Sequence, residues 1–243
     1  MSILPGVEHV DALMEQCNLP GRQRADYLAI NRSVIIEQKS LDVDPDYKVP
    51  EFFEKHTNVN SIGDSDLISR SHIIRQLPDG TKLGIDRYRS LTKGLDDILS
   101  KADKQTRDTR KTFLIPQAIG VVVILTDNAQ TLEPDVLAIK AFEMLRKRSE
   151  TQEIRYRENH VVILICEAHR IRSNEPVDLI PTATIFSEAG DQSLLATDFA
   201  ESLLRCWAKF NKASYTEASD CWRDFKTRDP AKNFTIGESK FSA

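Results

Sequence analysis

Asp26, Glu37 and Lys39 carry the groups in this sequence that point most directly to chemistry. Like charges that face each other destabilise a sheet, and carboxylates in apolar surroundings need a compensating partner. A hard divalent cation held by carboxylate oxygens supplies that partner. These residue types therefore predict a metal site that is made of two carboxylates with an ammonium beside them.

A β-hairpin over residues 24–41 is the element that must bring these side chains together. Asn31-Arg32 is flanked on both sides by strand-forming residues, which indicates two strands and a tight turn. The flanking residues are Tyr27, Leu28, Ile30, Val34, Ile35 and Ile36.

The hairpin register decides which side chains meet. With Asn31-Arg32 as a two-residue loop, Ile30 faces Ser33, and counting outwards places Asp26 opposite Glu37. Their Cα atoms are then about 4.5 to 5.5 Å apart. Because side chains alternate along a strand, Lys39 lies on the same face as Glu37.

Composition describes a chain that can bury a full core. The chain has 243 residues, 40% of them hydrophobic, and a formal net charge of −4. A nucleic-acid-binding domain is ordinarily basic, so a polyanion would have to meet a local patch. The four widely spaced cysteines favour buried free thiols, and the sequence shows no signal peptide or membrane span. A soluble, cytoplasmic protein is expected.

Two continuous apolar runs, residues 119–128 and 160–169, are separated by an amphipathic helix over residues 133–148. Such runs are typical of parallel strands that are buried on both faces and joined by a crossover helix. A strand over Thr182–Phe186 and a helix over residues 197–210, with Phe199, Leu203, Leu204 and Trp207 facing inwards, complete an α/β core.

We expect one domain over residues 1–213, with an insertion over residues 42–90 and a polar tail over residues 214–243. The insertion is acidic and rich in turn signals at its start, with short helical signals further on. No chemistry can be assigned to it from sequence.

A helix is predicted over residues 91–113, and its second half is basic. Lys101, Lys104, Arg107, Arg110 and Lys111 dominate this half. Such a charge run is either a solvated helix face or a stripe that follows the phosphates of a nucleic acid.

The Asp26 … Glu37-Gln38-Lys39 pattern on a hairpin resembles the PD-(D/E)XK nuclease superfamily. The resemblance covers mainly residues 7–41, and the order of elements agrees more loosely to about residue 170. It implies a restriction-endonuclease-like core, which is a mixed central sheet flanked by helices. It also implies a Mg²⁺-dependent endonuclease that hydrolyses phosphodiester bonds, with DNA favoured over RNA and a homodimer compatible with duplex cutting.

By this resemblance, Asp26 and Glu37 would ligate Mg²⁺, for which Mn²⁺ can substitute, and the backbone carbonyl of Gln38 would add a ligand. Lys39 would position the attacking water or help to deprotonate it. Two carboxylates around a divalent ion suit phosphodiester hydrolysis, which needs a nucleophile at neutral pH and neutralisation of phosphate charge.

Two further residues match the family pattern at a distance. Glu15, on a helix over residues 7–17, would be an extra metal ligand, whereas a solvated helix-surface position is the alternative. Gln105 on the basic helix matches a polar residue often found there, which would contact nucleic acid with its basic neighbours.

The pattern departs from the family in the strands that lead to the motif. Three antiparallel strands are expected and two are evident, because residues 18–23 are short and polar. The third strand is expected around Lys82–Arg87 or is absent. The proline that ordinarily precedes the aspartate is also displaced, since Pro20 stands six residues before Asp26.

Two other interpretations remain open. On an exposed edge hairpin, Glu37 and Lys39 would form an ordinary ion pair of little energetic value. Alternatively, the same scaffold would serve as a noncatalytic module that binds nucleic acid or protein.

Overall fold

The computed structural model describes residues 6–17, 24–42, 80–170, 180–213 and 215. The chain divides into two compact units, residues 1–44 with 94–217 and residues 45–93 with 218–243. The first unit holds the β-sheet and every residue of the predicted metal site.

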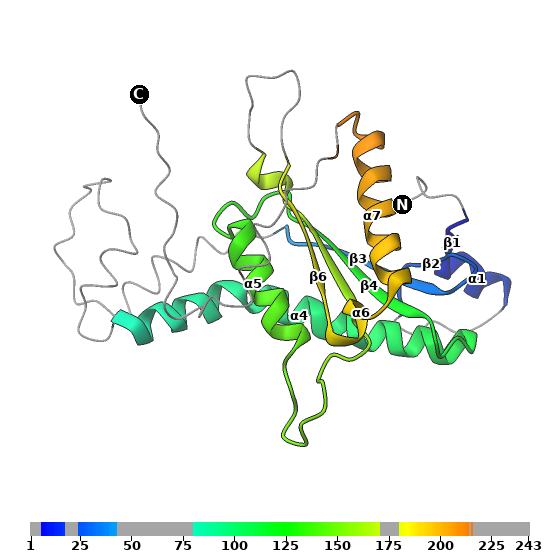
Figure 1. Cartoon of the computed structure of the whole chain (residues 1–243), viewed down its shortest axis with the longest axis horizontal. Coiled ribbons are helices and arrows are strands. Elements are labelled where there is room, and N and C mark those ends of the chain that lie inside the picture. The colour runs from blue at the N-terminus through cyan, green and yellow to red at the C-terminus, as the bar shows by residue number, and fades with distance from the viewer. Residues whose placement is uncertain (1–5, 18–23, 43–79, 171–179, 214, 216–243) are drawn as a thin grey trace. The chain divides into compact units, whose positions relative to one another are not determined.

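Among the described residues, six strands form one mixed sheet in the order β1-β2-β3-β4-β5-β6 (Figure 1). The strands are β1 (Glu8–His9), β2 (Tyr27–Ala29), β3 (Val34–Ser40), β4 (Ile119–Leu125), β5 (Val161–Ile165) and β6 (Thr182–Phe186). The central strands β3, β4 and β5 are parallel, and the outer pairs β1-β2, β2-β3 and β5-β6 are antiparallel. The predicted α/β class, with helices flanking a mixed sheet, is confirmed.

The β2–β3 hairpin has the predicted register. The last strand pair before the turn is Ala29 with Val34, which agrees with that register, and the Ser33 N–H donates to the Ile30 carbonyl at 3.0 Å. The two central residues, Asn31 and Arg32, have φ angles of 50° and 65°. Positive φ at both positions is what a type I′ turn requires, and this turn matches the twist of the two strands.

The third antiparallel strand is β1, which comes before helix α1 (Val10–Gln16). Glu8 on β1 forms an ion pair with Arg32 of the hairpin turn, with 2.8 Å between Oε2 and Nε. The expectation of a strand around residues 82–87 is wrong, because those residues lie within a helix. Residues 18–23 lie outside the described part of the chain.

Helix α4 (Gly80–Phe113) is longer than the helix predicted over residues 91–113. Its N-terminal turns take up the end of the insertion predicted over residues 42–90. The rest of that insertion, residues 43–79, lies outside the described residues, as does nearly all of the tail predicted over residues 214–243.

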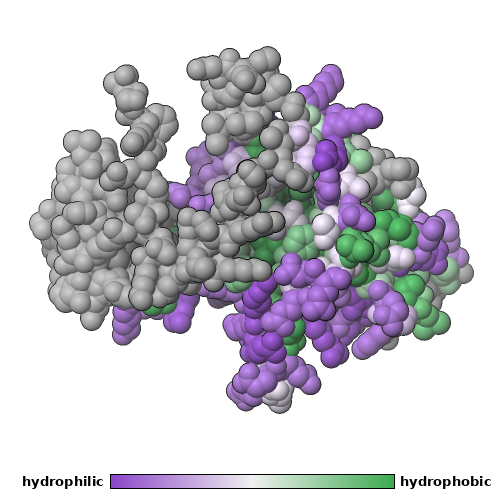
Figure 2. Space-filling model, viewed as in Figure 1, coloured by the Kyte–Doolittle hydropathy of each residue, from purple (hydrophilic) through white to green (hydrophobic). Residues whose placement is uncertain are grey.

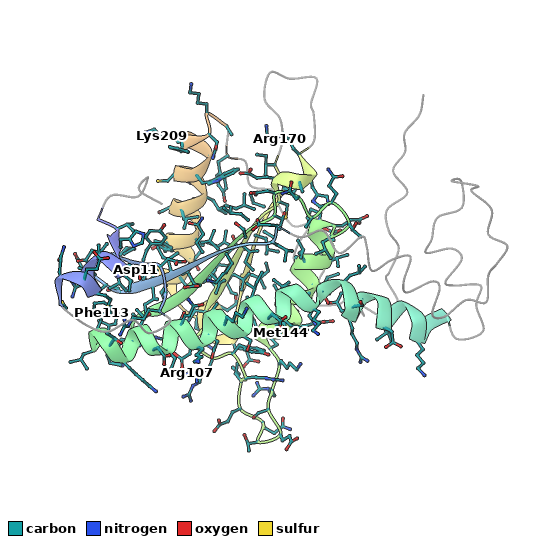
Figure 3. The ribbon with its side chains drawn as sticks, turned by 180° about the vertical axis from the view of Figure 1, so that it is seen from behind. Asp11, Arg107, Phe113, Met144, Arg170 and Lys209 are labelled. Atoms are coloured by element: carbon teal, nitrogen blue, oxygen red, sulfur yellow. The ribbon has the colours of Figure 1, made fainter. Side chains whose placement is uncertain are left out.

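The C-terminal half of α4 packs closely against the sheet, and it lies in front of the strands in Figure 3. Gly120 of β4 permits this approach. A Cβ atom at that position would lie 2.8 Å from the Thr106 side chain and 2.1 Å from the Glu158 carbonyl oxygen. Any larger residue would push α4 or the segment before β5 away from the sheet.

Helix α7 (Leu194–Phe210) covers the other face of the sheet and makes the predicted core with it. Phe199, Leu203 and Leu204 are buried, and Trp207 is partly buried against the same cluster. The strand side chains in this cluster include Val34, Ile36, Val121, Val123, Val161 and Ile163. The even positions of β3 therefore face α7, which leaves Ile35, Glu37 and Lys39 on the face that α4 covers.

Three shorter helical segments complete the described fold. Helix α5 (Pro134–Leu145) joins the parallel strands β4 and β5, as the sequence predicts, and packs on β5 and β6. The 3₁₀ turn η2 (Glu167–His169) follows β5, and helix α6 (Glu188–Asp191) follows β6. No helix in the described part of the chain is both long enough and apolar enough to cross a membrane.

Candidate metal centre at the β2–β3 hairpin

Glu37 is fully buried in the middle of β3, with 0% of its surface exposed. Its neighbour across the sheet is Val122 of β4. Apolar positions such as Ile35 and Val122 are expected in a central parallel strand, whereas a carboxylate there is not. This burial rules out the interpretation of Glu37 as an exposed residue of an edge hairpin.

Lys39 lies on the same face as Glu37, as predicted, and its Nζ forms an ion pair with Glu37 Oε1. The Lys39 side chain is 27% exposed, so it connects the buried carboxylate to solvent. Among the described residues, neither Glu37 oxygen has a hydrogen-bond partner of ordinary geometry. The Lys39 ammonium is thus a cationic partner of Glu37, and a buried carboxylate that depends on so few partners is costly.

Asp26 lies beside β3, but its backbone is not paired with Glu37 as predicted. It lies in a bend before β2, and its N–H donates to the Ile36 carbonyl at 3.1 Å, so it does not pair directly with Glu37. Since Tyr27 also pairs with Ile36, two residues lie opposite one, as in a β-bulge. The Asp26 carboxylate then accepts the Gln38 N–H at 2.7 Å, which fixes it beside β3.

Burial raises the pKa of Glu37 from 4.5 to about 7. The Lys39 ammonium and the nearby Gln105 side chain oppose this shift, whereas the negative charge of Asp26 adds to it. Burial is the largest cause, since it removes water from the charged form. The site therefore holds a carboxyl group that changes charge near neutral pH.

Helix α4 holds the residues that lead into Asp26. Gln105 Nε2 donates to the Arg24 carbonyl at 2.7 Å, and the Ala25 N–H donates to the Thr109 hydroxyl at 2.9 Å. The Arg24 guanidinium also donates to Thr112 at 3.3 Å. Gln105 thus lies near Asp26 and Glu37, and its predicted contact with nucleic acid stays a prediction. Thr109 and Thr112 were missed because their polar side chains carry no pattern of their own.

Glu15 is not brought to the carboxylates. It is exposed on α1, whose buried residues are Val10 and Met14. In the part of the chain that the structure describes, no group of three acidic, histidine or cysteine side chains is arranged to hold a metal ion. The solvated-surface alternative for Glu15 describes its position in this structure.

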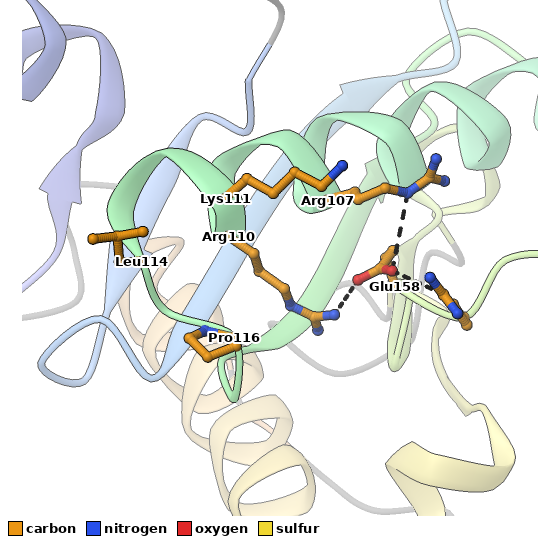
Figure 4. Close-up of a pocket in the computed structure, with 7 residues that line it drawn as sticks. Arg107, Arg110, Lys111, Leu114, Pro116 and Glu158 are labelled. Atoms are coloured by element: carbon orange, nitrogen blue, oxygen red, sulfur yellow. Dashed lines mark hydrogen bonds and ion pairs between the residues drawn. The ribbon is translucent and has the colours of Figure 1, made fainter.

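The predicted basic stripe of α4 is divided between two environments. Lys101, Lys104 and Lys111 are exposed, in keeping with a surface that can meet phosphates. Arg107 and Arg110 instead form ion pairs with Glu158 (Figure 4). Arg110 Nε also donates to the Ala118 carbonyl at 2.8 Å. The Arg110 side chain is only 15% exposed. The prediction that it belongs to a solvated stripe that meets phosphates is therefore corrected.

The residues at the hairpin fit a small, hard cation. Asp26 and Glu37 provide carboxylate oxygens, and Glu37 is buried with Lys39 and Gln105 as its polar partners. Mg²⁺ is commonly held by one or two carboxylates, with water and substrate phosphate as its other ligands. Asp26 and Glu37 are therefore of the residue type that holds this ion.

No protein-family model matches the chain, and no curated protein or solved structure matches it.

Proposed function

We propose that this protein is a Mg²⁺-dependent nuclease that hydrolyses phosphodiester bonds of DNA at the β2–β3 hairpin. The carrying observation is the fully buried Glu37 carboxylate, which has the Lys39 ammonium and the Gln105 side chain as its partners and the charge of Asp26 close by. A core carboxylate with this few partners costs stability, so a function is the best reason for its presence.

In this proposal, Asp26 and Glu37 hold Mg²⁺, and the backbone carbonyl of Gln38 is a further candidate ligand. The metal, when bound, would activate water and neutralise charge on the phosphate. The Gln38 N–H keeps the Asp26 carboxylate in place through the 2.7 Å hydrogen bond. Gln105 and Thr109 keep the preceding backbone against α4 and so set the direction from which Asp26 enters.

Lys39 would act on the attacking water. Its Nζ lies at the boundary between the buried Glu37 carboxylate and solvent, where it can donate a hydrogen bond to a water molecule. Lys101 is one helical turn before Gln105 and, with exposed Lys104, would contact the DNA backbone.

The order of elements supports a restriction-endonuclease-like core. A strand preceded by the aspartate pairs antiparallel with the strand that carries Glu37 and Lys39, and α4 then crosses to the parallel strand β4. The position of β1 before α1 departs from the order implied by the resemblance.

A cleavage assay tests the proposal. Labelled single-stranded and double-stranded DNA would be incubated with the protein and Mg²⁺ or Mn²⁺, beside Glu37→Gln and Lys39→Ala. Asp198→Asn, an exposed carboxylate change on α7, is the matched control. We expect cleavage by wild type and the control, and a loss of at least about a hundredfold in both site variants. Cleavage that survives both site substitutions would refute the assignment.

A noncatalytic binding module is the alternative, and one feature favours it. The Gln38 N–H occupies an Asp26 oxygen, and Lys39 pairs with Glu37, so the three side chains are partly compensated without a metal. Absence of cleavage with every substrate and metal, together with metal-independent DNA binding, would support this alternative.

A further inference from the structure

A groove of about 530 Å³ lies on the side of α4 that faces Glu158 (Figure 4). Its polar lining comes from Arg107, Arg110 and Lys111 of α4 and from Arg157 and Glu158, which lie just before β5. Gln105 and Thr109 of the same helix contact residues 24 and 25 instead. The groove and the metal centre therefore use different faces of α4.

Three guanidinium groups converge on one carboxylate at this groove. Glu158 forms ion pairs with Arg110, with Arg157 at 3.2 Å and with Arg107 at 3.9 Å. The Glu158 side chain is 7% exposed and Arg110 is 15% exposed, whereas Arg107 and Arg157 are 42% and 69% exposed. The buried ion pair of Arg110 and Glu158 thus forms the floor of the groove. The guanidinium groups of Arg107 and Arg157 remain accessible from it.

The groove carries an excess of positive charge. Arg107 also pairs with Asp103, whose other oxygen accepts the Glu158 N–H at 2.9 Å. Two carboxylates therefore face three arginines, and exposed Lys111 adds a fourth cation. Two positive charges remain uncompensated by these carboxylates, and an anion in the groove would neutralise them with charge-assisted hydrogen bonds.

We propose that this groove binds a backbone phosphate of a nucleic acid, in addition to any phosphate at the metal centre. The inference rests on the proposed function for its choice of ligand. Arginine guanidinium groups suit phosphate oxygens because they present planar pairs of donors. The cavity is several times larger than a phosphate group, so a sugar-phosphate backbone can pass through it.

The surroundings favour a polyanion over a single small anion. Lys101, Lys104 and Lys111 are exposed along about 15 Å of α4, a length that several phosphates of one strand would span. The segment between α5 and β5, which includes Arg157, projects at the bottom of the view in Figure 1 and is predominantly hydrophilic in Figure 2. This segment extends the polar surface beyond the groove.

Binding to a fluorescein-labelled DNA duplex, measured by anisotropy over a series of salt concentrations, tests the proposal. The full chain with Glu37→Gln would be used in EDTA, so that cleavage does not interfere. The groove variant is Lys111→Gln with Arg157→Gln, two exposed positions whose loss should leave the fold intact. The control is Arg205→Gln with Lys209→Gln on α7, an equal change of charge away from α4; Figure 3 labels Lys209 and Arg107.

We expect the groove variant to bind the duplex about tenfold more weakly and to lower the slope of log K against log salt by about 1, the value for one lost phosphate contact. The control should match the parent. Equal losses in both variants, or no duplex binding by the parent, would overturn the proposal. So would groove-dependent binding of a labelled polyglutamate peptide without groove-dependent binding of DNA.

Cleavage by the wild-type chain is measured separately, so the two proposals can fail independently. If duplex binding depends on the groove but no metal supports cleavage, the phosphate-binding proposal is supported and the nuclease proposal is refuted. If the protein cleaves DNA but duplex binding does not depend on the groove, the nuclease proposal is supported and the phosphate-binding proposal is refuted.

Discussion

Two buried carboxylates of this protein, Glu37 and Glu158, differ in how they are satisfied. Glu158 is surrounded by arginines, and its backbone N–H is held by Asp103. Glu37 has one ammonium partner, and its pKa is raised to about 7 by burial. Burial alone therefore does not mark a functional carboxylate. The small number of partners at Glu37 points to a ligand. The three arginines around Glu158 point instead to a structural network that carries a net positive charge.

Glu158→Gln is expected to have the largest effect on stability. It leaves the Arg110 guanidinium buried without its carboxylate, and breaking a buried ion pair in this way costs about 3 to 5 kcal/mol. Chemical denaturation at pH 7 would measure the loss. A cost below about 1 kcal/mol would mean that Glu158 is not the centre of a structural network, and the contrast with Glu37 would fail.

Glu37→Gln is expected to stabilise the metal-free protein at alkaline pH. Between pH 4.5 and 7 the folded state binds more protons than the unfolded state, so stability falls as pH rises through this window. The shift corresponds to about 3 kcal/mol at pH 8, which the uncharged glutamine would restore.

Unfolding curves in EDTA at pH 4 and pH 8 measure this difference. Wild type and Glu37→Gln should agree at pH 4 and separate at pH 8, whereas Asp198→Asn should follow wild type at both. A Glu37→Gln variant that is no more stable than wild type at pH 8 would show that the carboxylate is well compensated.

Thr109→Val should have a smaller effect, since it removes the acceptor for the Ala25 N–H. An unsatisfied buried donor costs about 1 to 3 kcal/mol. Because residues 24 and 25 lead into Asp26, the variant should displace this carboxylate. The rate of cleavage should therefore fall by more than the loss of folded protein alone accounts for. Thr197→Val, at an exposed position on α7, is the matched control for denaturation and cleavage. Unchanged activity in Thr109→Val would mean that α4 does not position the site.

Much of the fold follows from local patterns in the sequence. Asn31-Arg32 between two apolar strands fixed the hairpin register, and Lys39 was correctly placed with Glu37 because side chains alternate along a strand. The β-branched runs that became β4 and β5 identified a parallel pair buried on both faces.

The errors concern features that local patterns do not encode. β1 is too short, at two residues, to show alternation. The bend at Asp26 involves a backbone hydrogen bond to Ile36, ten residues further along the chain, which no local pattern reveals. Arg110 was assigned to a surface stripe because its partner, Glu158, lies 48 positions away in sequence. Long-range ion pairs of this kind appear once the elements are packed together.

Calorimetric titration with Mn²⁺ tests most directly whether Asp26 and Glu37 form a metal site. We predict saturable binding at one site in wild type and in Asp198→Asn, and loss of that binding in Glu37→Gln and in Asp26→Asn. Near pH 7, binding should also release protons, because the metal competes with the proton on Glu37. Binding by Glu37→Gln that equals wild type, or no binding by wild type, would contradict the account.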